Sequence, residues 1–381
     1  MSGISNRKIL LVLLKTIVFI ACLFPFLVVY LPDIIGKYQT EDTTFALKKI
    51  PNNNRTIPAI TLCSLKPYKL ETIKKATGSY NREAFSLNVT FSSNISVPSL
   101  FREASFLLNR DFFIFFGIGS KKLEIGRNEM KGFIINIDEV PTRMQGMCYS
   151  LLFERSLGGY MGFKIVPDTT QDYSPEGMIF HVSTKSTIST LSLPVGKVER
   201  SIKPLVVAKK FAFRYKMIVD LEETVWQFHK GNPNCLEGCS LEHCYNDHNL
   251  TEELDCMPIV RKALFPSSTL ALCLTPEENS KMVAKIDNKT YAINCPLPAS
   301  DVEFSAIVTD DEFLAMPDPK DVIIAQFRQS STLKTLKKEV LIYDTASLIG
   351  SLGGFLGLFI GFSFFGVVSL IIDKLDWYCL K

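Results

Sequence analysis

The chain has 381 residues, of which 47% are hydrophobic and 21% are charged, and its formal net charge is +3. Such a chain is too apolar for intrinsic disorder, and its small net charge, with no long basic run, gives no indication of a nucleic-acid partner. The longest apolar runs lie near the two ends of the chain. This distribution predicts membrane-spanning segments at both ends and a lipid bilayer as a partner.

The first apolar segment covers residues 9–31 and contains one charge, Lys15. About 20 apolar residues are enough to cross a bilayer, so this segment predicts transmembrane helix 1. Lys15 lies close enough to one end for its ammonium group to reach the interface. A cleaved signal peptide is the alternative. Its apolar region is usually only about 7–15 residues long, and the absence of a clean cleavage site here favours a retained helix.

The second apolar segment predicts transmembrane helix 2 at residues 346–372, and it has no charged residue from Leu348 to Ile372. Basic residues Arg7 and Lys8 precede the first helix, and Lys374 follows the second. The excess of basic residues on the cytoplasmic side of membranes indicates that both chain ends are cytoplasmic. We expect a multi-pass protein of the plasma membrane with short cytoplasmic ends, residues 1–8 and 373–381.

The long segment between the two helices, residues 32–345, has the marks of an extracellular domain. It contains five Asn-x-Ser/Thr sequons, whereas the chain ends contain none. Several sequons confined to one segment favour exposure to the glycosylation machinery. Glycosylation is therefore expected at Asn54, Asn88, Asn94, Asn249 and Asn288.

Ten cysteines are present, of which Cys22 lies in the first apolar segment and Cys379 in the C-terminal end. The other eight lie in the extracellular segment, where an oxidising compartment predicts up to four disulfides. Six of these fall between residues 235 and 295, which predicts a subdomain held by disulfides. A zinc site is the alternative, but thiols oxidise outside the cell, which disfavours its ligands, Cys239, His243, Cys244 and His248.

Between the helices the sequence predicts mostly strands, in one compact domain. Phe112–Ile118 is a dense aromatic run that predicts a buried strand, with a subunit contact or a lipid-facing patch as the alternative. Further strands are expected at Ile57–Leu65, Lys131–Val140, Cys148–Phe153, Asp321–Phe327 and Glu339–Tyr343. Helices are expected at Asn279–Lys285 and near Asn234–His243. The fold class is an α+β membrane protein, with two transmembrane helices flanking one large, disulfide-rich and β-rich extracellular domain.

Nothing in the sequence indicates an enzyme. None of the four histidines lies in a nucleophile or metalloprotease motif, and no phosphate-binding glycine loop is present. We therefore expect no cofactor and no resident metal. The acidic run Asp310, Asp311 and Glu312 is interpreted as a solvated turn, with proton sensing or calcium binding as the alternative.

Glycines recur along the second apolar segment at spacings of three or four residues, so they share one face of a helix. Such a face lets two helices approach closely within a membrane. Glycine also eases unwinding of a helix, and freed carbonyls are tolerated at membrane depth along a water-filled cavity, where they can replace the hydration shell of a cation. A packing seam and a pore are equally compatible with glycines at 350, 353, 354, 357 and 361.

From residue 350 this segment reads GSLGGFLGLFIGFSFFGVVSL and resembles the second transmembrane helix of the degenerin/epithelial sodium channel/acid-sensing ion channel superfamily. Several other segments resemble blocks of that family in the right order. They are PAITLC at Pro58–Cys63, GMCY at Gly146–Tyr149, QDY at Gln171–Tyr173, the Cys235–Cys239 spacing and CPLP at Cys295–Pro298. The resemblance extends over residues 57–372.

The resemblance implies a trimeric, amiloride-sensitive channel through which Na⁺ permeates passively and in preference to K⁺. It implies a selectivity ring of Gly361, Phe362 and Ser363. It also implies gating through the extracellular domain, with a cysteine-rich thumb at about 230–300 transmitting movement to the pore helix. The gating glycines would be Gly350, at the degenerin position, and then Gly353, Gly354 and Gly357.

The family pattern also implies specific disulfides. They are Cys63–Cys148, Cys235–Cys295 and Cys256–Cys273. Ile293 stands where the family has the usual partner of Cys239, so Cys239–Cys244 is the remaining pairing.

The chain also departs from the family. Ser351 stands where many members carry Asp or Asn, Ser369 stands where many carry Glu, and the His-Gly motif before the first helix is absent. The two serines remove carboxylates that attract cations. A non-conducting or modulatory subunit of a heteromeric channel is therefore one alternative, and a single-span cell-surface receptor is another. The sequence predicts neither the stimulus nor whether the trimer is homomeric or heteromeric.

Overall fold

The computed structural model describes most of residues 32–345 and parts of both apolar segments. The described residues are 13, 17, 20, 24, 26–80, 84–85, 89–91, 94–118, 121–124, 135–143, 145–153, 160–168, 177–184, 204–207, 214–229, 244, 250–265, 267–292, 300–314, 322–329 and 331–360. The chain divides into two compact units, one of residues 1–46 and 338–381 and the other of residues 47–337.

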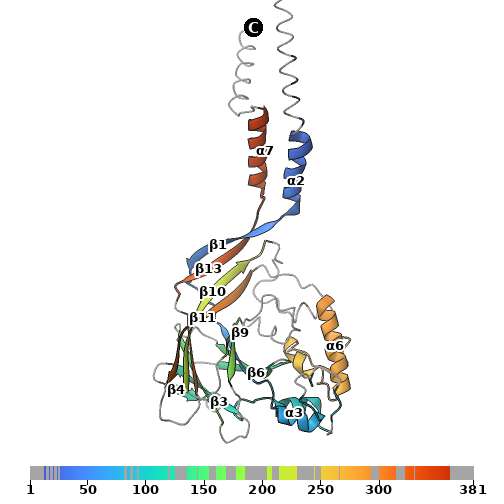
Figure 1. Ribbon diagram of the computed structural model, residues 1–381, viewed down its shortest axis with the longest axis vertical. Coiled ribbons are helices and arrows are strands. Elements are labelled where there is room, and N and C mark those ends of the chain that lie inside the picture. Colours follow the sequence, from blue (N-terminus) through green and yellow to red (C-terminus); the bar gives the residue numbers. More distant parts are fainter. Residues whose placement is uncertain are drawn as a thin grey trace, which may run out of the picture. The chain divides into compact units, whose positions relative to one another are not determined.

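The first unit contains the π-helical turn η1 (Phe26–Tyr30) and the helices α2 (Leu31–Thr40) and α7 (Thr345–Ile360). Pro32 in the first turn of α2 has no N–H to donate to the preceding turn, which accounts for the irregular geometry of η1. The two α-helices lie side by side (Figure 1), and the ring centroids of Tyr30 and Phe355 are 4.8 Å apart.

α7 begins one residue before the predicted start at 346, whereas helical structure at the other end continues to Thr40, beyond the predicted limit at 31. Within the described residues, no helix combines the length and the apolarity needed to cross a bilayer. The spans at 9–31 and 346–372 therefore stay predictions.

The described residues of the second unit form three α-helices, a 3-10 helix and most of two sheets; the first four residues of β1 and the last four of β13 belong to the first unit. The helices are α3 (Leu70–Thr77), α4 (Val97–Ala104), α6 (Pro276–Ala292) and the 3-10 helix η3 (Ile259–Leu264). The larger sheet has eight strands: β1 (Thr43–Pro51), β3 (Phe112–Ile118), β4 (Lys121–Glu124), β7 (Tyr160–Pro167), β10 (Arg214–Gln227), β11 (Ser300–Leu314), β12 (Ile323–Arg328) and β13 (Leu333–Leu341). The smaller sheet has five: β2 (Ala59–Ser64), β5 (Ile135–Thr142), β6 (Gly146–Phe153), β8 (Met178–Ser183) and β9 (Pro204–Val207).

β10 organises the larger sheet, whose order is β1-β13-β10-β12-β7-β3-β4 with β11 also paired to β10. β10 and β11 are antiparallel along their whole length, from Arg214 opposite Leu314 to Gln227 opposite Ser300. β12 joins β10 in parallel. The segment of residues 228–299 is thus inserted between two neighbouring strands, and β1, β13, β10 and β11 run side by side (Figure 1).

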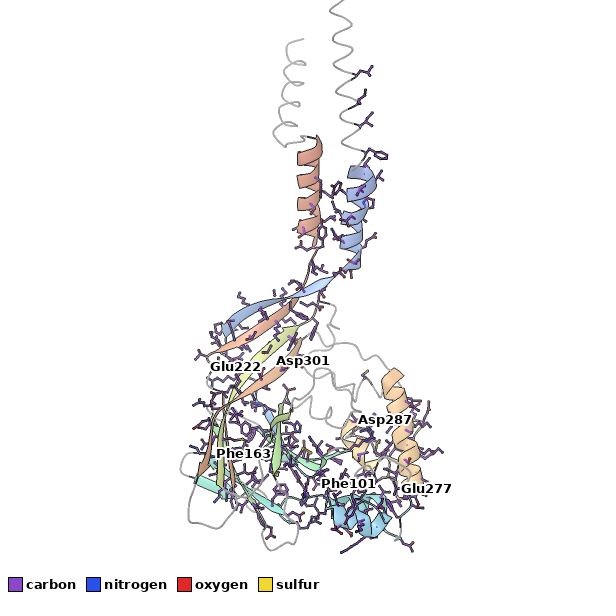
Figure 2. All side chains as sticks on the ribbon, in the orientation of Figure 1. Phe101, Phe163, Glu222, Glu277, Asp287 and Asp301 are labelled. Carbon is purple, nitrogen blue, oxygen red and sulfur yellow. A yellow bond between two sulfur atoms is a disulfide. The ribbon has the colours of Figure 1, made fainter. Side chains whose placement is uncertain are left out.

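The smaller sheet has the order β5-β6-β2-β8-β9. Its two faces differ because side chains alternate along each strand. One face, with Ile60 and Leu62 on β2, joins the main core together with side chains of α3, α4 and the larger sheet, including Phe101 and Phe163 (Figure 2). The opposite face carries Cys63 and is packed against Ala263 of η3.

The aromatic run at Phe112–Ile118 is β3, with the predicted bounds. Phe112 and Ile114 are fully buried in the main core. The prediction of a buried strand is confirmed for these two side chains. β2, β6 and β12 also overlap their predicted ranges, whereas β13 begins six residues before the predicted start at Glu339.

The predicted helix at Asn279–Lys285 is the middle of the longer α6. Its start follows from a capping box, in which the N–H of Glu278 donates to Thr275 Oγ1 (3.3 Å) and the N–H of Thr275 donates to Glu278 Oε2 (3.2 Å). Pro276 is compatible with the first helical position because no N–H is needed there. Apolar side chains of α6, Met282 and Ile286, complete a second core with Leu264 and Phe265.

The interpretation of the acidic run as a turn was wrong. Asp310, Asp311 and Glu312 lie in β11, opposite Ile218, Met217 and Lys216 of β10. Aspartate disfavours strands when considered alone, but the long partner strand provides backbone hydrogen bonds for this segment. The predicted helix near 234–243 lies outside the described residues.

Candidate functional site

Asp344 caps the N-terminus of α7, the helix that carries the glycine repeat. Its Oδ1 accepts the N–H of Ser347 at 2.8 Å, which satisfies one of the free donors of the first turn. The side-chain hydrogen bond with Ser347, and then the bond from its N–H, hold the pKa of Asp344 below its ordinary value. The carboxylate is exposed and ionised at neutral pH. One negative charge therefore stands at the entrance to the helix.

The glycine face of α7 is open. A Cβ built at any of four glycines would meet no atom within 4 Å, apart from the helix's own nearby backbone, and these are Gly350, Gly353, Gly354 and Gly357. Among the described residues of one chain, the repeat is therefore not a seam against α2. With respect to the part of the chain that the structure describes, the face is free for a neighbouring copy or for water. The predicted selectivity residues Gly361, Phe362 and Ser363 lie outside the described residues.

The described residues of the first apolar segment present an apolar stripe. Four side chains at helical spacing each have more than half of their surface exposed: Leu13, Ile17, Ile20 and Phe24. Spacings of three or four residues place them on one face of a helix. A stripe of this kind has the chemistry of a surface in contact with lipid.

The block Gly146–Tyr149 has a clear structural reason. Gly146 has a φ of +68°, and a side chain there would collide with the carbonyl oxygen of Pro67, so only glycine fits. Cys148 lies directly opposite Cys63 on β2 and forms a disulfide with it. The hydroxyl of Tyr149 accepts the N–H of Leu108 at 3.0 Å. The block thus joins β2, β6 and the turn before β3.

His181 on β8 is buried beside this disulfide face. Its Nε2 donates to Oε1 of Gln145 at 3.0 Å, and its Nδ1 has no hydrogen-bond partner among the described residues. Burial lowers the pKa of His181 to about 4. Its register neighbour is Thr61, whose Oγ1 hydrogen bonds Ser150 Oγ at 3.0 Å. His181 is therefore neutral at physiological pH. Its protonation would place a charge in a buried position, which is unfavourable.

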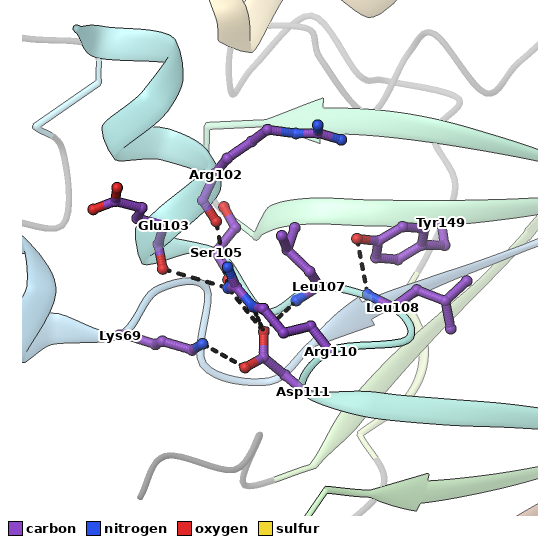
Figure 3. Close-up of polar contacts among 9 residues, drawn as sticks. All are labelled: Lys69, Arg102, Glu103, Ser105, Leu107, Leu108, Arg110, Asp111 and Tyr149. Atoms are coloured by element: carbon purple, nitrogen blue, oxygen red, sulfur yellow. Dashed lines mark hydrogen bonds and ion pairs between the residues drawn. The ribbon is translucent and has the colours of Figure 1, made fainter. Parts of the chain in front are cut away.

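A second polar cluster fixes the junction between α4 and β3 (Figure 3). The fully buried carboxylate of Asp111 forms ion pairs with Lys69 and Arg110 and accepts the N–H of Leu107 at 2.7 Å. Arg110 Nη2 in turn donates to the carbonyl of Ser105 (2.8 Å), just beyond the last residue of α4. Each charge in this buried cluster has a partner, which is the condition for burying charge without a large loss of stability.

A third polar cluster, around Glu223 on β10, holds the segment that links β1 to β2. The buried carboxylate accepts the hydroxyl of Thr56 (2.9 Å) and pairs with Lys334 of β13 (3.3 Å). Gln329 Nε2 donates to the same carboxylate at 3.3 Å. Three chain segments, around residues 56, 223 and 334, therefore converge on one buried charge.

On the opposite face of β10, Trp226 joins two neighbouring strands. Its Nε1 donates to Glu303 Oε2 of β11 at 2.9 Å, and Lys337 Nζ of β13 lies 4.1 Å from its ring centroid. The ring also stacks on Phe228, with the planes 9° apart. β13 leads along the chain to Asp344 and α7. Trp226 thus fastens this connection to the strand pair that carries the insertion of residues 228–299.

The predicted thumb contains one complete disulfide among the described residues, Cys256–Cys273. Cys244 is also disulfide-bonded, which removes the thiolate that the alternative zinc site needed there. Its partner lies outside the described residues. So do Cys235, Cys239 and Cys295, together with the disulfides predicted for them.

Three of the five predicted glycosylation sites are described, and all three side chains are exposed: Asn54, Asn94 and Asn288. Exposure is what attachment of a glycan requires. Asn88 and Asn249 lie outside the described residues.

Sequence reasoning missed several of these groups. Asp344 had a detectable signal, since an aspartate three residues before Ser347 at a helix start is typical of an N-cap. Gly146 was included only as part of a family block. Glu223 and Trp226 had no signal, because their partners are far away in the sequence. The same holds for the ion pair of Asp111 with Lys69, which is 42 residues away.

The chain was compared with known families, curated proteins and solved structures. The family described as amiloride-sensitive sodium channel matches residues 4–191 and 226–372. No curated protein matches the chain. Among solved structures, the chain is similar to a cryo-EM structure of a proton-activated chloride channel, with a TM-score of 0.38 and 7% sequence identity over 98% of both chains. At that score, the similarity carries no argument about ion selectivity or assembly.

Proposed function

The chain belongs to the amiloride-sensitive sodium channel family, a family of membrane ion channels, and on that premise we propose that it is one subunit of a trimeric, sodium-preferring, amiloride-sensitive cation channel gated through its extracellular domain. The match covers most of the chain and includes both segments predicted to span the membrane. The proposed location is the plasma membrane, with both chain ends in the cytoplasm.

The observation that carries this proposal is the open glycine face of α7. Gly350 and Gly354 are four residues apart on this face, and neither has a neighbour within 4 Å of a built Cβ. In a trimer of such helices the face turns toward the threefold axis, where small residues leave room for water and ions. Gly361, Phe362 and Ser363 would follow one turn further on and form the proposed selectivity ring.

Asp344 supplies a charge that suits cation entry. Three copies of the chain would place three exposed carboxylates at the N-termini of the pore helices, before the apolar segment begins. A ring of negative charge raises the local concentration of cations. Many family members have carboxylates or amides where this chain has Ser351 and Ser369. Asp344 would attract cations in place of those missing groups.

The coupling between extracellular domain and pore helix is proposed to run through β13. This strand is held on one face by the pair Glu223–Lys334 and on the other by Lys337 over Trp226. Movement of the insertion between β10 and β11 would reach α7 through these contacts. The stimulus that starts this movement is not specified by any described residue.

The test is voltage clamp of cells expressing the chain alone, unmutated or as Gly350→Phe. A bulky side chain on the open face is expected to hold the helices apart and to give a sodium current that amiloride blocks. Gly36→Phe in α2 is the matched control, because a Cβ at Gly36 also meets nothing within 4 Å. It is expected to leave the current unchanged.

Surface-delivered protein without current in any variant would contradict a homomeric channel. The specific alternative is then a modulatory subunit of a heteromeric channel, which the missing carboxylates at Ser351 and Ser369 favour. Co-expression with other family members, followed by measurement of altered current amplitude or block, distinguishes this role from a protein with no part in conduction.

A further inference from the structure

Thr56 has two roles that compete with each other. It completes the glycosylation sequon Asn54-Arg55-Thr56, and it also belongs to the buried cluster around Glu223. Its hydroxyl donates to Glu223 Oε1 at 2.9 Å, and its backbone N–H donates to Glu223 Oε2 at 3.3 Å. Asn54 itself is exposed. The asparagine and the hydroxyl of one sequon therefore lie in different environments.

The contact between Thr56 and Glu223 is one of several that hold this loop. The side chain of Glu223 has no exposed surface, and its carboxylate also accepts Lys334 Nζ and Gln329 Nε2, each at 3.3 Å. Lys334 Nζ donates in addition to the backbone carbonyl of Asn54 at 3.3 Å. Hydrogen bonds to a buried ionised group are among the stronger ones. In the folded domain the sequon is thus held by its hydroxyl and by its backbone.

Attachment of a glycan makes a demand that this arrangement does not meet. In the transfer, the amide nitrogen of Asn attacks C1 of an oligosaccharide that is carried on a lipid diphosphate. The N–C1 bond forms, the bond between C1 and the phosphate oxygen breaks, the lipid diphosphate leaves, and the enzyme takes up one amide proton. The motif requires Ser or Thr two residues after the Asn because the enzyme binds that hydroxyl during the transfer. A hydroxyl bound to Glu223 is not available to the enzyme.

The sequon Asn94-Ile95-Ser96 provides a contrast within the same chain. Ser96 precedes α4 in an extended conformation, with a φ of −69° and a ψ of 152°, and its side chain makes no capping hydrogen bond. Its hydroxyl donates to Ser99 Oγ at 2.9 Å in an exposed contact, which water or an enzyme replaces readily. Asn94 is exposed as well. This sequon therefore keeps an accessible asparagine and an accessible hydroxyl after folding.

We propose that Asn54 is a glycosylation site that folding closes: it accepts a glycan before Thr56 binds Glu223 and not afterwards, whereas Asn94 stays competent in the folded domain. A chain that is modified in time carries its glycan on an exposed asparagine, which is compatible with the fold. A chain that folds first keeps Asn54 unmodified. Occupancy at Asn54 is then set by the rate of folding and not by exposure alone.

The order of synthesis leaves time for the modification. Thr56 and Glu223 are 167 residues apart, and at a synthesis rate of about 5–20 residues per second Glu223 is made roughly 8–33 s after Thr56. Lys334, which holds the carbonyl of Asn54, is made later still, 280 residues after Asn54. The inference depends on the extracellular placement of residues 32–345 and not on ion conduction.

Glycosylation of the purified, full-length chain tests this proposal. The chain is produced without glycans and incubated in detergent with a purified oligosaccharyltransferase and its lipid-linked donor, in variants that keep one sequon and have Asn→Gln at the other four. A chymotryptic digest of the same protein is the unfolded reference. Digestion is expected to raise the rate at Asn54 by at least about tenfold, because a hydrogen bond to a charged group favours the closed state by that factor or more. The rate at Asn94 is expected to change little. Equal rates at Asn54 in folded and digested protein would overturn the proposal.

The matched control moves the sequon by one residue. Asn54→Gln with Arg55→Thr makes Asn53 the acceptor, which is exposed in the same loop, and leaves Thr56 and Glu223 unchanged. The new hydroxyl is not the one that Glu223 binds, so Asn53 is expected to be modified at similar rates in folded and digested protein. Folded protein that is modified at neither Asn53 nor Asn54 would show that the loop as a whole excludes the enzyme, which overturns the role of Glu223.

Site occupancy in cells separates this inference from the proposed topology. In cells that lack the form of the transferase that acts during translocation, the glycan at Asn54 is expected to be lost while the glycan at Asn94 persists. Full occupancy at Asn54 in those cells overturns the closing of the sequon and leaves the topology intact. Absence of a glycan from both asparagines in ordinary cells contradicts the extracellular placement of the segment, and with it the proposed channel.

Discussion

The guanidinium of Arg261 is completely buried and donates to a single oxygen of Asp287, from Nε at 3.1 Å and from Nη2 at 2.8 Å. This pair ties η3 to α6. We predict that Asp287→Ala lowers the free energy of unfolding by about 3–5 kcal/mol, because a buried charge loses its carboxylate. Thermal unfolding of the full-length protein in detergent measures this change.

The control for that prediction is Glu253→Ala. Glu253 pairs with Lys285 and Lys289 at the surface, where solvent screens the charges, so its loss is expected to cost much less than the loss of Asp287. Replacing both members of the buried pair, as Arg261→Met with Asp287→Leu, is expected to cost less than Asp287→Ala alone. A double variant that is less stable than the single variant would contradict the argument that Asp287→Ala destabilises by removing the carboxylate from a buried charge.

The two described disulfides are predicted to differ in their contributions to stability. Cys63 and Cys148 are 85 residues apart, whereas Cys256 and Cys273 are 17 apart. By the loop-closure argument, removal of the first disulfide costs about 4–5 kcal/mol and removal of the second about 3 kcal/mol. Paired alanine variants, compared by urea unfolding, measure the difference. Equal midpoint shifts would show that chain entropy is not the dominant contribution.

The buried His181 is predicted to make the protein sensitive to acid. Its pKa is about 4 in the folded chain, against about 6.5 in an unfolded one. The unfolded chain therefore binds more protons between these values, so the contribution of His181 to stability is complete above about pH 6.5, falls as the pH decreases from about 6.5 to 4, and is lost below that. The full loss is about 3 kcal/mol.

The variant His181→Gln removes this titration and keeps a donor toward Gln145. Its unfolding temperature is expected to decrease less than that of the unmutated protein between pH 7 and pH 4. Carboxylates that titrate in the same range affect both proteins alike, so the difference between the two curves reports on His181. Parallel curves would mean that the imidazole stays neutral or finds a partner when protonated.

Asp344 has two separable effects, a charge and a helix cap. Asn is as good an N-cap as Asp, so Asp344→Asn is expected to keep α7 intact while lowering sodium conductance about twofold to threefold at low ionic strength. Asp344→Ala removes the cap as well, which is expected to destabilise the first turn of the helix. Single-channel recording at low and high salt separates the two, since only the charge effect is screened by salt.

Those parts of the fold that depend on local pattern were predictable. The run Phe112–Ile118 is continuous, apolar and bounded by polar residues, so the strand and its burial could be expected. The pairs Cys63–Cys148 and Cys256–Cys273 were implied by the family blocks and are both present. The glycine spacing from Gly350 is enough to place four residues on one helix face.

The parts that depend on distant partners were not predictable. Glu223 and Lys334 are 111 residues apart, and nothing near either one indicates that the carboxylate is buried. The acidic run at Asp310 was misinterpreted because local propensity disfavours a strand there, whereas the register with β10 requires one. Tertiary pairing thus outweighs intrinsic preference at this segment.

The insertion between β10 and β11 begins and ends at adjacent positions, since Gln227 is opposite Ser300 in the register. A segment anchored in this way can change in length or sequence without altering the spacing of the strands that hold it. The strand pair β10–β11 could therefore hold a different inserted segment at the same two positions. The insertion would then evolve, or be engineered, independently of α7.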